Sequence, residues 1–316
     1  MKKSITLLLA MIAMSANAQF LFRVSGNQLK EPSYIMGSIH TIRDTVIEKM
    51  PAYLEAEAKC KQFYNEIDIT DTIAAKSTLT LSPKIETLPD GKNIMDLMNK
   101  DQIELLDMRF KETLYKNFTD STMKDFWDKK PATIARALIG IIALQEQLKN
   151  DKLDEWGTKF TARIDYTCLK RAKDRGLKVG QLEEMKTHKS YLDTIMSASN
   201  DTTMTIDSLM TFLKNLDECR QLIANDLQKN GQLIKYWYNG DYDSLTKDDT
   251  FVKHVNSMTV LIKERNLKWL PIMQTAMNEA PTMFIFGALH LIGDNGIIKE
   301  LRNKGYTVEQ IPSRVD

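Results

Sequence analysis

The sequence predicts an α/β protein with a central mixed, partly parallel sheet built from segments near both ends of the chain, and a large helical insertion in the middle. Three observations predict this class. Short β-prone runs of apolar residues lie near both ends. Apolar residues recur every three or four positions through the middle, as they do in amphipathic helices. The stretch 282–311 then reads as strand, helix and strand, within the roughly 30 residues of a βαβ unit.

The N-terminal elements follow from β-prone runs and turn residues. Residues 20–24 and 33–38 are β-prone, and a Ser-Gly-Asn turn follows the first run, which predicts a hairpin. Residues 45–59 follow a helical pattern that contains Pro51, so this proline should lie in a first turn or at a break. Residues 62–69 predict a third strand.

The middle of the chain is predicted to be helical apart from one strand. Apolar side chains recur at helical spacing between 93 and 149. The later predicted elements are, in order, a helix at 165–174, a strand at 176–182, helical blocks at 184–229 and 249–278, a strand at 282–287, a helix at 297–304 and a strand at 306–311. No linker rich in Pro, Gly or Ser divides the chain, which favours a single domain, residues 19–316, whose helical middle at about 93–280 forms a sub-lobe.

The first 18 residues have the pattern of a secretory signal peptide. Lys2 and Lys3 precede an apolar run at 5–14, and small residues lead to a cleavage point after Ala18. The apolar run is shorter than the ~20 residues that cross a bilayer. We therefore expect a periplasmic or secreted protein with no membrane span after cleavage.

The composition disfavours several functional classes. Lys and Arg total 43 against 42 for Asp and Glu, so no excess of positive charge predicts a nucleic-acid partner. The three cysteines, Cys60, Cys168 and Cys219, allow at most one disulfide and include no C-x-x-C pair. A disulfide scaffold, a thioredoxin-like protein and a zinc ribbon are therefore disfavoured. A peptide or a small-molecule substrate remains as the expected partner, with the oligomeric state left open.

A repeated motif carries the functional prediction. His40 and His290 each lie three residues after a glycine, in Gly-Ser-Ile-His and Gly-Ala-Leu-His, and each motif follows a β-prone run. Glu66 and Glu183 also lie at predicted strand ends, and Glu66 is expected to share a strand face with Asp68. Ligands of open α/β sheets gather outside the carboxyl ends of the strands. If the four strands are neighbours, the two histidines and two glutamates meet at one edge.

Two imidazoles and one or two carboxylates form a ligand set for a divalent transition metal, whose bound water becomes a nucleophile near neutral pH. A carboxylate that does not bind the metal could act as general base. For each residue alone, the alternative is a cap or a solvated loop side chain. Arg265 is interpreted either as a surface charge or as a clamp for a substrate carboxylate or carbonyl. His188 and His254 have lysine neighbours and are predicted to be solvated.

These motifs resemble the TraB/GumN family of exported bacterial proteins, which is related to the Tiki metalloproteases. The resemblance covers nearly the whole mature chain, with matching segments at 22–27, 34–40, 180–183, 237–241, 264–266, 287–291 and 305–308. It implies that His40 and His290 are metal ligands, that Glu66 is the matching acidic residue and that Arg265 matches a family arginine. It also implies a peptidase that uses Mn²⁺ or Co²⁺, with Zn²⁺ still allowed. Glu184 stands where the family usually has threonine, and a neighbouring branch resembles erythromycin-esterase-like proteins.

The leading prediction is an exported metal-dependent hydrolase of the peptidase type. His40, His290, Glu66 and Glu183 are the predicted metal ligands, and Glu66, Glu183 and Arg265 are the predicted catalytic residues. A second hypothesis is a non-catalytic periplasmic binding protein for an exported peptide or glycan. A third treats both glycine–histidine motifs as strand ends that stabilise the fold.

Overall fold

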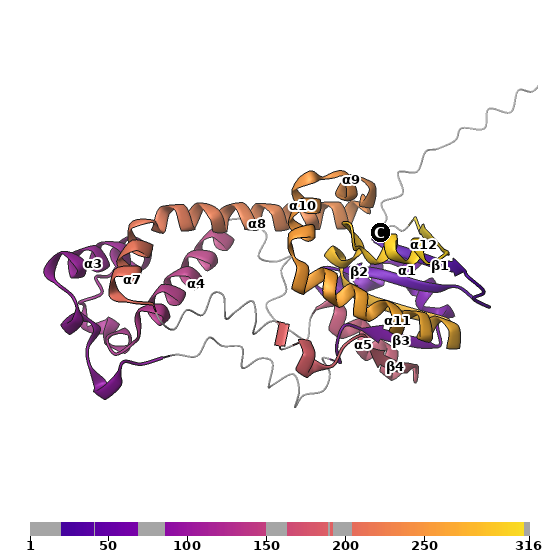
Figure 1. Cartoon of the computed structure of the whole chain (residues 1–316), viewed down its shortest axis with the longest axis horizontal. Coiled ribbons are helices and arrows are strands. Elements are labelled where there is room, and N and C mark those ends of the chain that lie inside the picture. The colour runs from indigo at the N-terminus through magenta and orange to yellow at the C-terminus, as the bar shows by residue number, and fades with distance from the viewer. Residues whose placement is uncertain are drawn as a thin grey trace, which may run out of the picture.

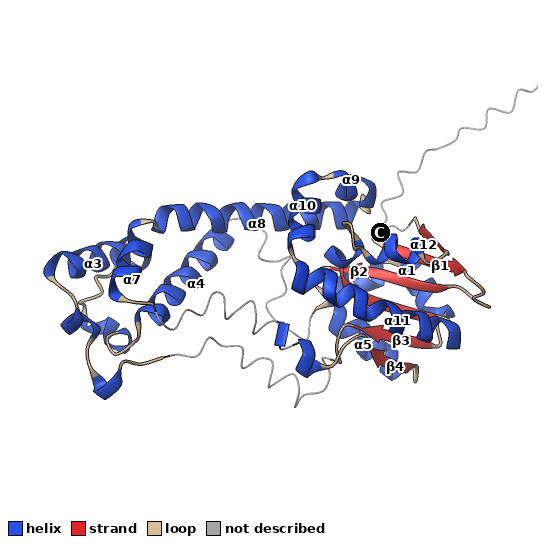
Figure 2. Cartoon of the chain, viewed as in Figure 1, coloured by secondary structure: helices blue, strands red, loops and turns tan. Residues whose placement is uncertain are grey.

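The protein combines a sheet-containing part with an elongated helical part, as Figure 1 shows. The computed structural model describes residues 20–40, 42–68, 86–149, 163–188, 190–191 and 204–312. The predicted signal peptide, residues 1–18, lies outside these residues. Figure 2 shows that the strands gather at one end of the molecule while helices make up the other. No helix among the described residues has both the length and the hydropathy needed to cross a membrane.

The predicted α/β class with a mixed sheet is confirmed. Six strands pair in the order β4-β3-β5-β2-β1-β6, and they come from both ends of the chain. Neighbouring strands from β4 to β2 are parallel, whereas β1 is antiparallel to both β2 and β6. The strands are β1 Leu21–Gly26, β2 Ser33–Ser38, β3 Gln62–Asn65, β4 Lys178–Gln181, β5 Thr282–Gly287 and β6 Tyr306–Gln310.

The structure refines two predictions near the N-terminus. A 3-10 helix, η1 (Asp44–Lys49), precedes α1 (Pro51–Lys59), and Pro51 occupies the start of α1, where its missing N–H costs no helical hydrogen bond. Strand β3 ends at Asn65, so the prediction that Glu66 and Asp68 share a strand face is wrong. The Asp68 carboxylate instead pairs with Lys173, with the oxygen 2.7 Å from Nζ.

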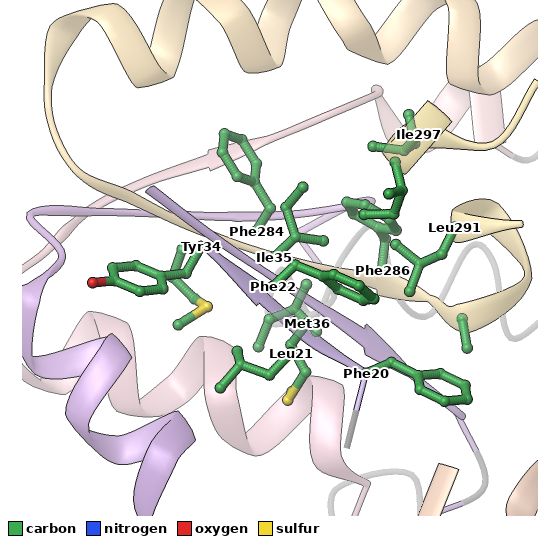
Figure 3. Packing of buried hydrophobic residues seen from close by; sticks show 14 of the residues in the cluster. Phe20, Leu21, Phe22, Tyr34, Ile35, Met36, Phe284, Phe286, Leu291 and Ile297 are labelled. Atoms are coloured by element: carbon green, nitrogen blue, oxygen red, sulfur yellow. The ribbon is translucent and has the colours of Figure 1, made fainter. Parts of the chain in front are cut away.

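The central strands are buried because apolar side chains cover both faces of the sheet. All six residues of β2 are buried, as expected for a parallel strand inside a sheet. Figure 3 shows Phe22, Ile35 and Phe284, from β1, β2 and β5, in the same buried cluster as Leu291 and Ile297. The helices in contact with the sheet or its connections include α1, α5 (Ile164–Asp174), α11 (Glu264–Glu279) and α12 (Ile297–Asn303).

The last strand–helix–strand segment has the predicted order but not a neighbouring strand pair. It consists of β5, a short 3-10 turn η7 (Ala288–Leu291), α12 and β6. Strands β5 and β6 run in the same direction, since β6 is antiparallel to β1, β1 to β2, and β2 is parallel to β5. Strands β2 and β1 lie between them in the sheet.

The helical part has a hydrophobic core of its own, which includes Leu106, Phe110, Phe118, Leu138 and Leu213. Its elements are η2 (Pro89–Gly91), η3 (Ile94–Leu97), α3 (Lys100–Leu114), η4 (Ser121–Phe126), α4 (Pro131–Lys149) and α7 (Ile206–Lys214). Strand β4 and helix α11 lie within 93–280 but belong to the sheet part, so the separate helical region is narrower than predicted.

Helix α8 (Leu216–Asn239) joins the two parts along one side of the molecule, as Figure 1 shows. At its C-terminal end the indole N–H of Trp237 donates to the backbone oxygen of Gly37 over 2.6 Å. This bond ties α8 to strand β2 next to the first glycine–histidine motif. The chain then continues through α9 (Tyr242–Lys247), α10 (Asp249–Ser257) and a π-helical turn, η6 (Thr259–Lys263), into α11.

Candidate metal centre

The four predicted site residues follow four neighbouring parallel strands. His40 lies two residues beyond β2, Glu66 directly beyond β3, Glu183 two residues beyond β4 and His290 three residues beyond β5. These strands are adjacent in the order β4-β3-β5-β2, so their carboxyl ends share one edge of the sheet. The structure therefore brings the predicted residues to one edge, as the sequence indicated.

The glycines of the two motifs allow close packing between them. A Cβ on Gly37 would lie 3.2 Å from the Cα of Ala288 and would collide with the side chain of Leu291. A Cβ on Gly287 would lie 3.3 Å from His40 Nε2 and 3.4 Å from Glu66 Oε1. The missing side chains therefore let the second motif pack on β2 and leave space between His40 and Glu66.

A carboxylate from helix α5 orients His40. The Nδ1 atom of His40 lies 3.0 Å from Asp165 Oδ2, and the hydroxyl of Ser38 donates to the other oxygen of Asp165. With Nδ1–H donating to Asp165, Nε2 is the nitrogen that would bind a metal, after the loss of its own proton. This nitrogen lies 3.8 Å from Glu66 Oε1. The negative charge of Asp165 is the largest influence on the pKa of His40 and raises it to about 9.

An amide orients His290 in the same way. His290 Nδ1 lies 2.6 Å from Asn266 Oδ1. The Asn266 amide nitrogen donates to the backbone oxygens of His290 and Asn295, over 3.1 and 2.7 Å, which fixes Oδ1 as the atom that faces the ring. His290 therefore carries its proton on Nδ1 and has its lone pair on Nε2. Burial is the main cause that lowers the pKa of His290 to about 3.

The two carboxylate oxygens of Glu66 have different partners. Oε1 accepts the Gly287 N–H over 2.7 Å and faces His40, whereas Oε2 accepts from Arg265 Nη2 over 2.5 Å. Burial alone would raise the pKa of Glu66. The charge of Arg265, helped by His290, His40 and the Gly287 N–H, holds that pKa well below its usual range. Glu66 is therefore ionised and ready to accept hydrogen bonds or bind a cation.

Arg265 is buried inside the centre, which rules out the interpretation of Arg265 as a surface charge. Its side chain is 6% exposed, and all three guanidinium nitrogens have protein partners. Nε and Nη2 donate to Glu183, Nη2 also to Glu66, and Nη1 to the backbone oxygen of Leu261 in the π-helical turn. Nη1 also lies 3.2 Å from His290 Nε2. Arg265 thus holds the site together from within.

Glu183 and His188 form a pair beside Arg265, and the prediction that His188 is solvated is wrong. His188 Nδ1 lies 2.7 Å from Glu183 Oε1, and the His188 side chain is 17% exposed. The indole N–H of Trp269 donates to Glu183 Oε2 over 3.2 Å. Burial raises the pKa of Glu183, but His188 and Arg265 lower it overall. His254 is exposed, as predicted.

The described residues offer two groups of donor atoms for a cation, and both include Glu66. One is the pair His40 Nε2 and Glu66 Oε1, 3.8 Å apart, with which His290 does not form a three-ligand group within 4.8 Å among the described residues. The other is Glu66, Glu183 and His188, whose ligand atoms lie within 4.8 Å of one another. Imidazole nitrogen and carboxylate oxygen suit a divalent transition metal, so the residues fit one. The second group already surrounds the guanidinium of Arg265.

A small cavity opens next to the first group. Its volume is about 160 Å³, and it is lined by His40, Asn65, Glu66, Ile67, Arg163, Asp165, His188 and Ile285. The His40 side chain is 56% exposed, so this side of the centre is open to solvent and to a substrate. The buried Glu66 is one of its lining residues.

Sequence reasoning missed three residues that shape the centre: Asp165, His188 and Asn266. Asp165 lies 125 positions from His40, so no local pattern links the two. Asn266 directly follows Arg265, and this position next to a predicted site residue is the sequence feature that could have identified it. His188 lies five residues after Glu183, but its lysine neighbours suggested a solvated side chain.

Comparisons with known proteins identify a family that the chain matches over nearly its whole length. A profile described as the TraB/PrgY/gumN family matches residues 20–310. "Metalloprotease TIKI1" of Danio rerio is 23% identical over 325 residues, which are 89% of this chain and 61% of that protein. "Metalloprotease TIKI2" of Danio rerio is 23% identical over 336 residues, 93% of this chain and 61% of that protein.

"Metalloprotease TIKI1" of Homo sapiens is 23% identical over 331 residues, 89% of this chain and 60% of that protein. The chain therefore spans about 60% of the length of the curated relatives it matches. No solved structure matches the chain significantly.

Proposed function

The chain belongs to the TraB/PrgY/gumN family, and from this premise we propose that it is an exported metal-dependent hydrolase of the peptidase type. One observation carries the proposal. Two glycine–histidine motifs from separate parallel strands present imidazoles whose Nδ1 atoms are each held by a side-chain oxygen, beside the ionised carboxylate of Glu66. The relatives are named metalloproteases, which supports the same activity.

His40, His290 and Glu66 would hold a divalent transition metal, Mn²⁺ or Co²⁺ with Zn²⁺ allowed, which when bound supplies a water that loses its proton near neutral pH. Asp165 and Asn266 hold the two imidazoles in the tautomer that leaves Nε2 unprotonated. His290 Nε2 lies 3.2 Å from Arg265 Nη1, so His290 would have to exchange this guanidinium contact for the metal.

His188 is the side chain best placed to accept a proton from the reacting water. It lines the cavity, and Glu183 holds its Nδ1. Its Nε2 is then the nitrogen available for proton transfer, in the arrangement of a base oriented by a carboxylate. Because Glu183 is occupied by His188, Arg265 and Trp269, we assign it to positioning this base rather than to proton transfer itself.

Export is part of this proposal and depends on residues 1–18. Their Lys-Lys start, apolar run and small residues before the cleavage point are typical of a bacterial signal peptide. Mature protein that starts at Gln19 after expression with residues 1–18 present would support export. Protein that keeps Met1 and stays in the cytoplasm would contradict it.

The function is tested with the mature chain and three histidine variants. His40→Ala and the His40→Ala, His290→Ala double variant should lose bound Mn²⁺ in metal analysis and lose cleavage of a peptide library. His254→Ala, at an exposed histidine, is the matched control and should keep both. Unchanged cleavage in the double variant would refute metal-dependent hydrolysis at this site. A peptide or glycan that stays bound after chelation, with no product in mass spectra, would instead favour the non-catalytic binding protein.

A further inference from the structure

Glu66 lies between two cation positions, and only one of them is open. Its Oε1 faces His40 Nε2, while its Oε2 is bound to the guanidinium of Arg265. We propose that the centre takes a single divalent metal, and that Arg265 permanently fills the position where a two-metal hydrolase holds its second ion. This inference rests on the proposed function, since it concerns how many metals that function uses.

The position of Arg265 has the ligands that a metal would need. Glu66, Glu183 and His188 offer atoms within 4.8 Å of one another. Arg265 Nη2 lies 2.5 Å from Glu66 Oε2, 2.8 Å from Glu183 Oε1 and 3.4 Å from His188 Nδ1. A carboxylate that bridges two ions about 3.5–4 Å apart is the arrangement of two-metal hydrolases. In this protein one oxygen of Glu66 faces His40 and the other is bonded to the guanidinium of Arg265.

Several contacts keep Arg265 in this position. Its Nε donates to both oxygens of Glu183 over 3.1 Å, and Nη1 donates to the Leu261 backbone oxygen over 3.2 Å. The guanidinium carbon lies 4.6 Å from the centre of the Trp269 ring. A metal that displaced the guanidinium would leave a buried, unpaired positive charge, which is strongly unfavourable. The second position is therefore closed to metals.

The balance of charges at the centre also favours a single divalent metal. Three carboxylates, from Glu66, Asp165 and Glu183, are joined to the histidines and Arg265 by the contacts described above. Arg265 and one divalent ion together balance these three negative charges. A second divalent ion beside Arg265 would leave excess positive charge in a largely buried site, and such charge is costly away from water.

The test is Mn²⁺ stoichiometry on the mature full-length chain, by equilibrium dialysis and electron paramagnetic resonance. The wild-type protein should bind one Mn²⁺ with the six-line spectrum of an isolated ion. Arg265→Met removes the guanidinium but keeps an unbranched apolar side chain, and should bind two Mn²⁺ with an exchange-coupled spectrum. Arg265→Lys is the matched control, since it keeps a positive charge and should bind one.

The outcomes separate this inference from the proposed function. Two Mn²⁺ or a coupled spectrum in the wild-type protein would overturn the inference and leave a metal-dependent hydrolase. One Mn²⁺ in a folded Arg265→Met variant would also overturn it. No Mn²⁺ in the wild-type protein would overturn the proposed function and the inference with it. If Arg265→Met does not fold, Glu183→Gln replaces it: Mn²⁺ affinity should change less than threefold, and a larger loss would make Glu183 a metal ligand and refute the inference.

Discussion

Two side-chain oxygens decide which nitrogen of each motif histidine can bind a metal. Asp165 faces Nδ1 of His40, and Asn266 faces Nδ1 of His290. An ionised carboxylate can accept hydrogen bonds but cannot donate them. The Asn266 amide is fixed by two carbonyl oxygens that accept from its nitrogen. Nε2 is therefore the nitrogen of each ring that could bind a metal; that of His40 faces Glu66, and that of His290 faces Arg265. The same tautomer in both motifs has two different chemical causes.

Replacing Asp165 should weaken metal binding without direct contact to the metal. Asp165→Leu removes the acceptor for His40 Nδ1–H, and the Mn²⁺ affinity should fall by about 10–100-fold, the usual effect of losing such a partner. Asp165→Asn keeps an acceptor oxygen, because the Ser38 hydroxyl can accept from its amide, and should lose less. Titration calorimetry measures the affinities, and melting temperatures in chelator report folding. Equal Mn²⁺ affinity in all three proteins would show that Asp165 does not orient the ligand.

Local signals explain which site residues the sequence predicted. His40 and His290 each follow a β-prone run and a glycine, and Glu66 and Glu183 lie near strand ends, so the topology of the sheet was sufficient to group them. The role of Arg265 could not be predicted the same way. Its partners Glu66 and Glu183 lie 199 and 82 positions away, and only the packing of α11 against the sheet edge places it between them.

At the scale of elements, strand identities were predictable and strand ends were not. β3 ends at Asn65, and the carboxylate of the next residue, Glu66, accepts from the Gly287 N–H and from Arg265. A hydrogen bond to a residue more than 200 positions away has no local pattern. The alternation of β-prone residues therefore predicted too long a strand. The functional carboxylate lies at the point where the local pattern fails.

The first motif glycine should be required for the packing of η7 on β2. Gly37→Ala places a methyl group against Leu291 and the backbone of Ala288, and overpacking of this kind costs about 1–3 kcal/mol of unfolding free energy. Gly140→Ala, in helix α4 with no heavy atom within 4 Å of the added Cβ, is the matched control and should stabilise by up to ~1 kcal/mol. Urea unfolding of both variants measures the difference. Equal stabilities would show that the glycine is not needed for close packing.

At the scale of the whole molecule, two separate cores are joined by one long helix. The cluster around the sheet and the cluster of the helical part share no residue. In α8 the buried side chains are Leu216 at one end and Leu233, Ile234 and Trp237 at the other, so the middle of this helix crosses between the cores without a buried residue. Helical periodicity predicted these helices. It could not predict which core each helix joins, because an apolar stripe shows that one helix face is buried but not which element packs against that face.

The cysteines provide probes of the sheet core. All three are free, with Cys60 and Cys168 buried in the sheet core and Cys219 partly exposed on α8. Burial raises the pKa of Cys60 to about 12 and that of Cys168 further above its usual value. The thiolate is the reactive form, so raising the pH from 7 to 9 should leave both native thiols unreactive. Mass spectrometry after labelling with iodoacetamide should find the label on Cys219, and rapid labelling of Cys60 in native protein would contradict its burial.

Because the cores share no residue, we expect them to lose structure separately. Phe110→Ala removes a fully buried ring from the helical core and should cost that core about 3–5 kcal/mol. Helical circular dichroism should then fall at a lower urea concentration, while Cys60 and Cys168 stay protected from iodoacetamide up to the wild-type midpoint. Phe284→Ala, the same substitution in the sheet core, should instead expose both thiols at lower urea. If Phe110→Ala shifts thiol exposure by the same amount as the helical signal, the two cores unfold as one unit and α8 couples them despite its solvated middle.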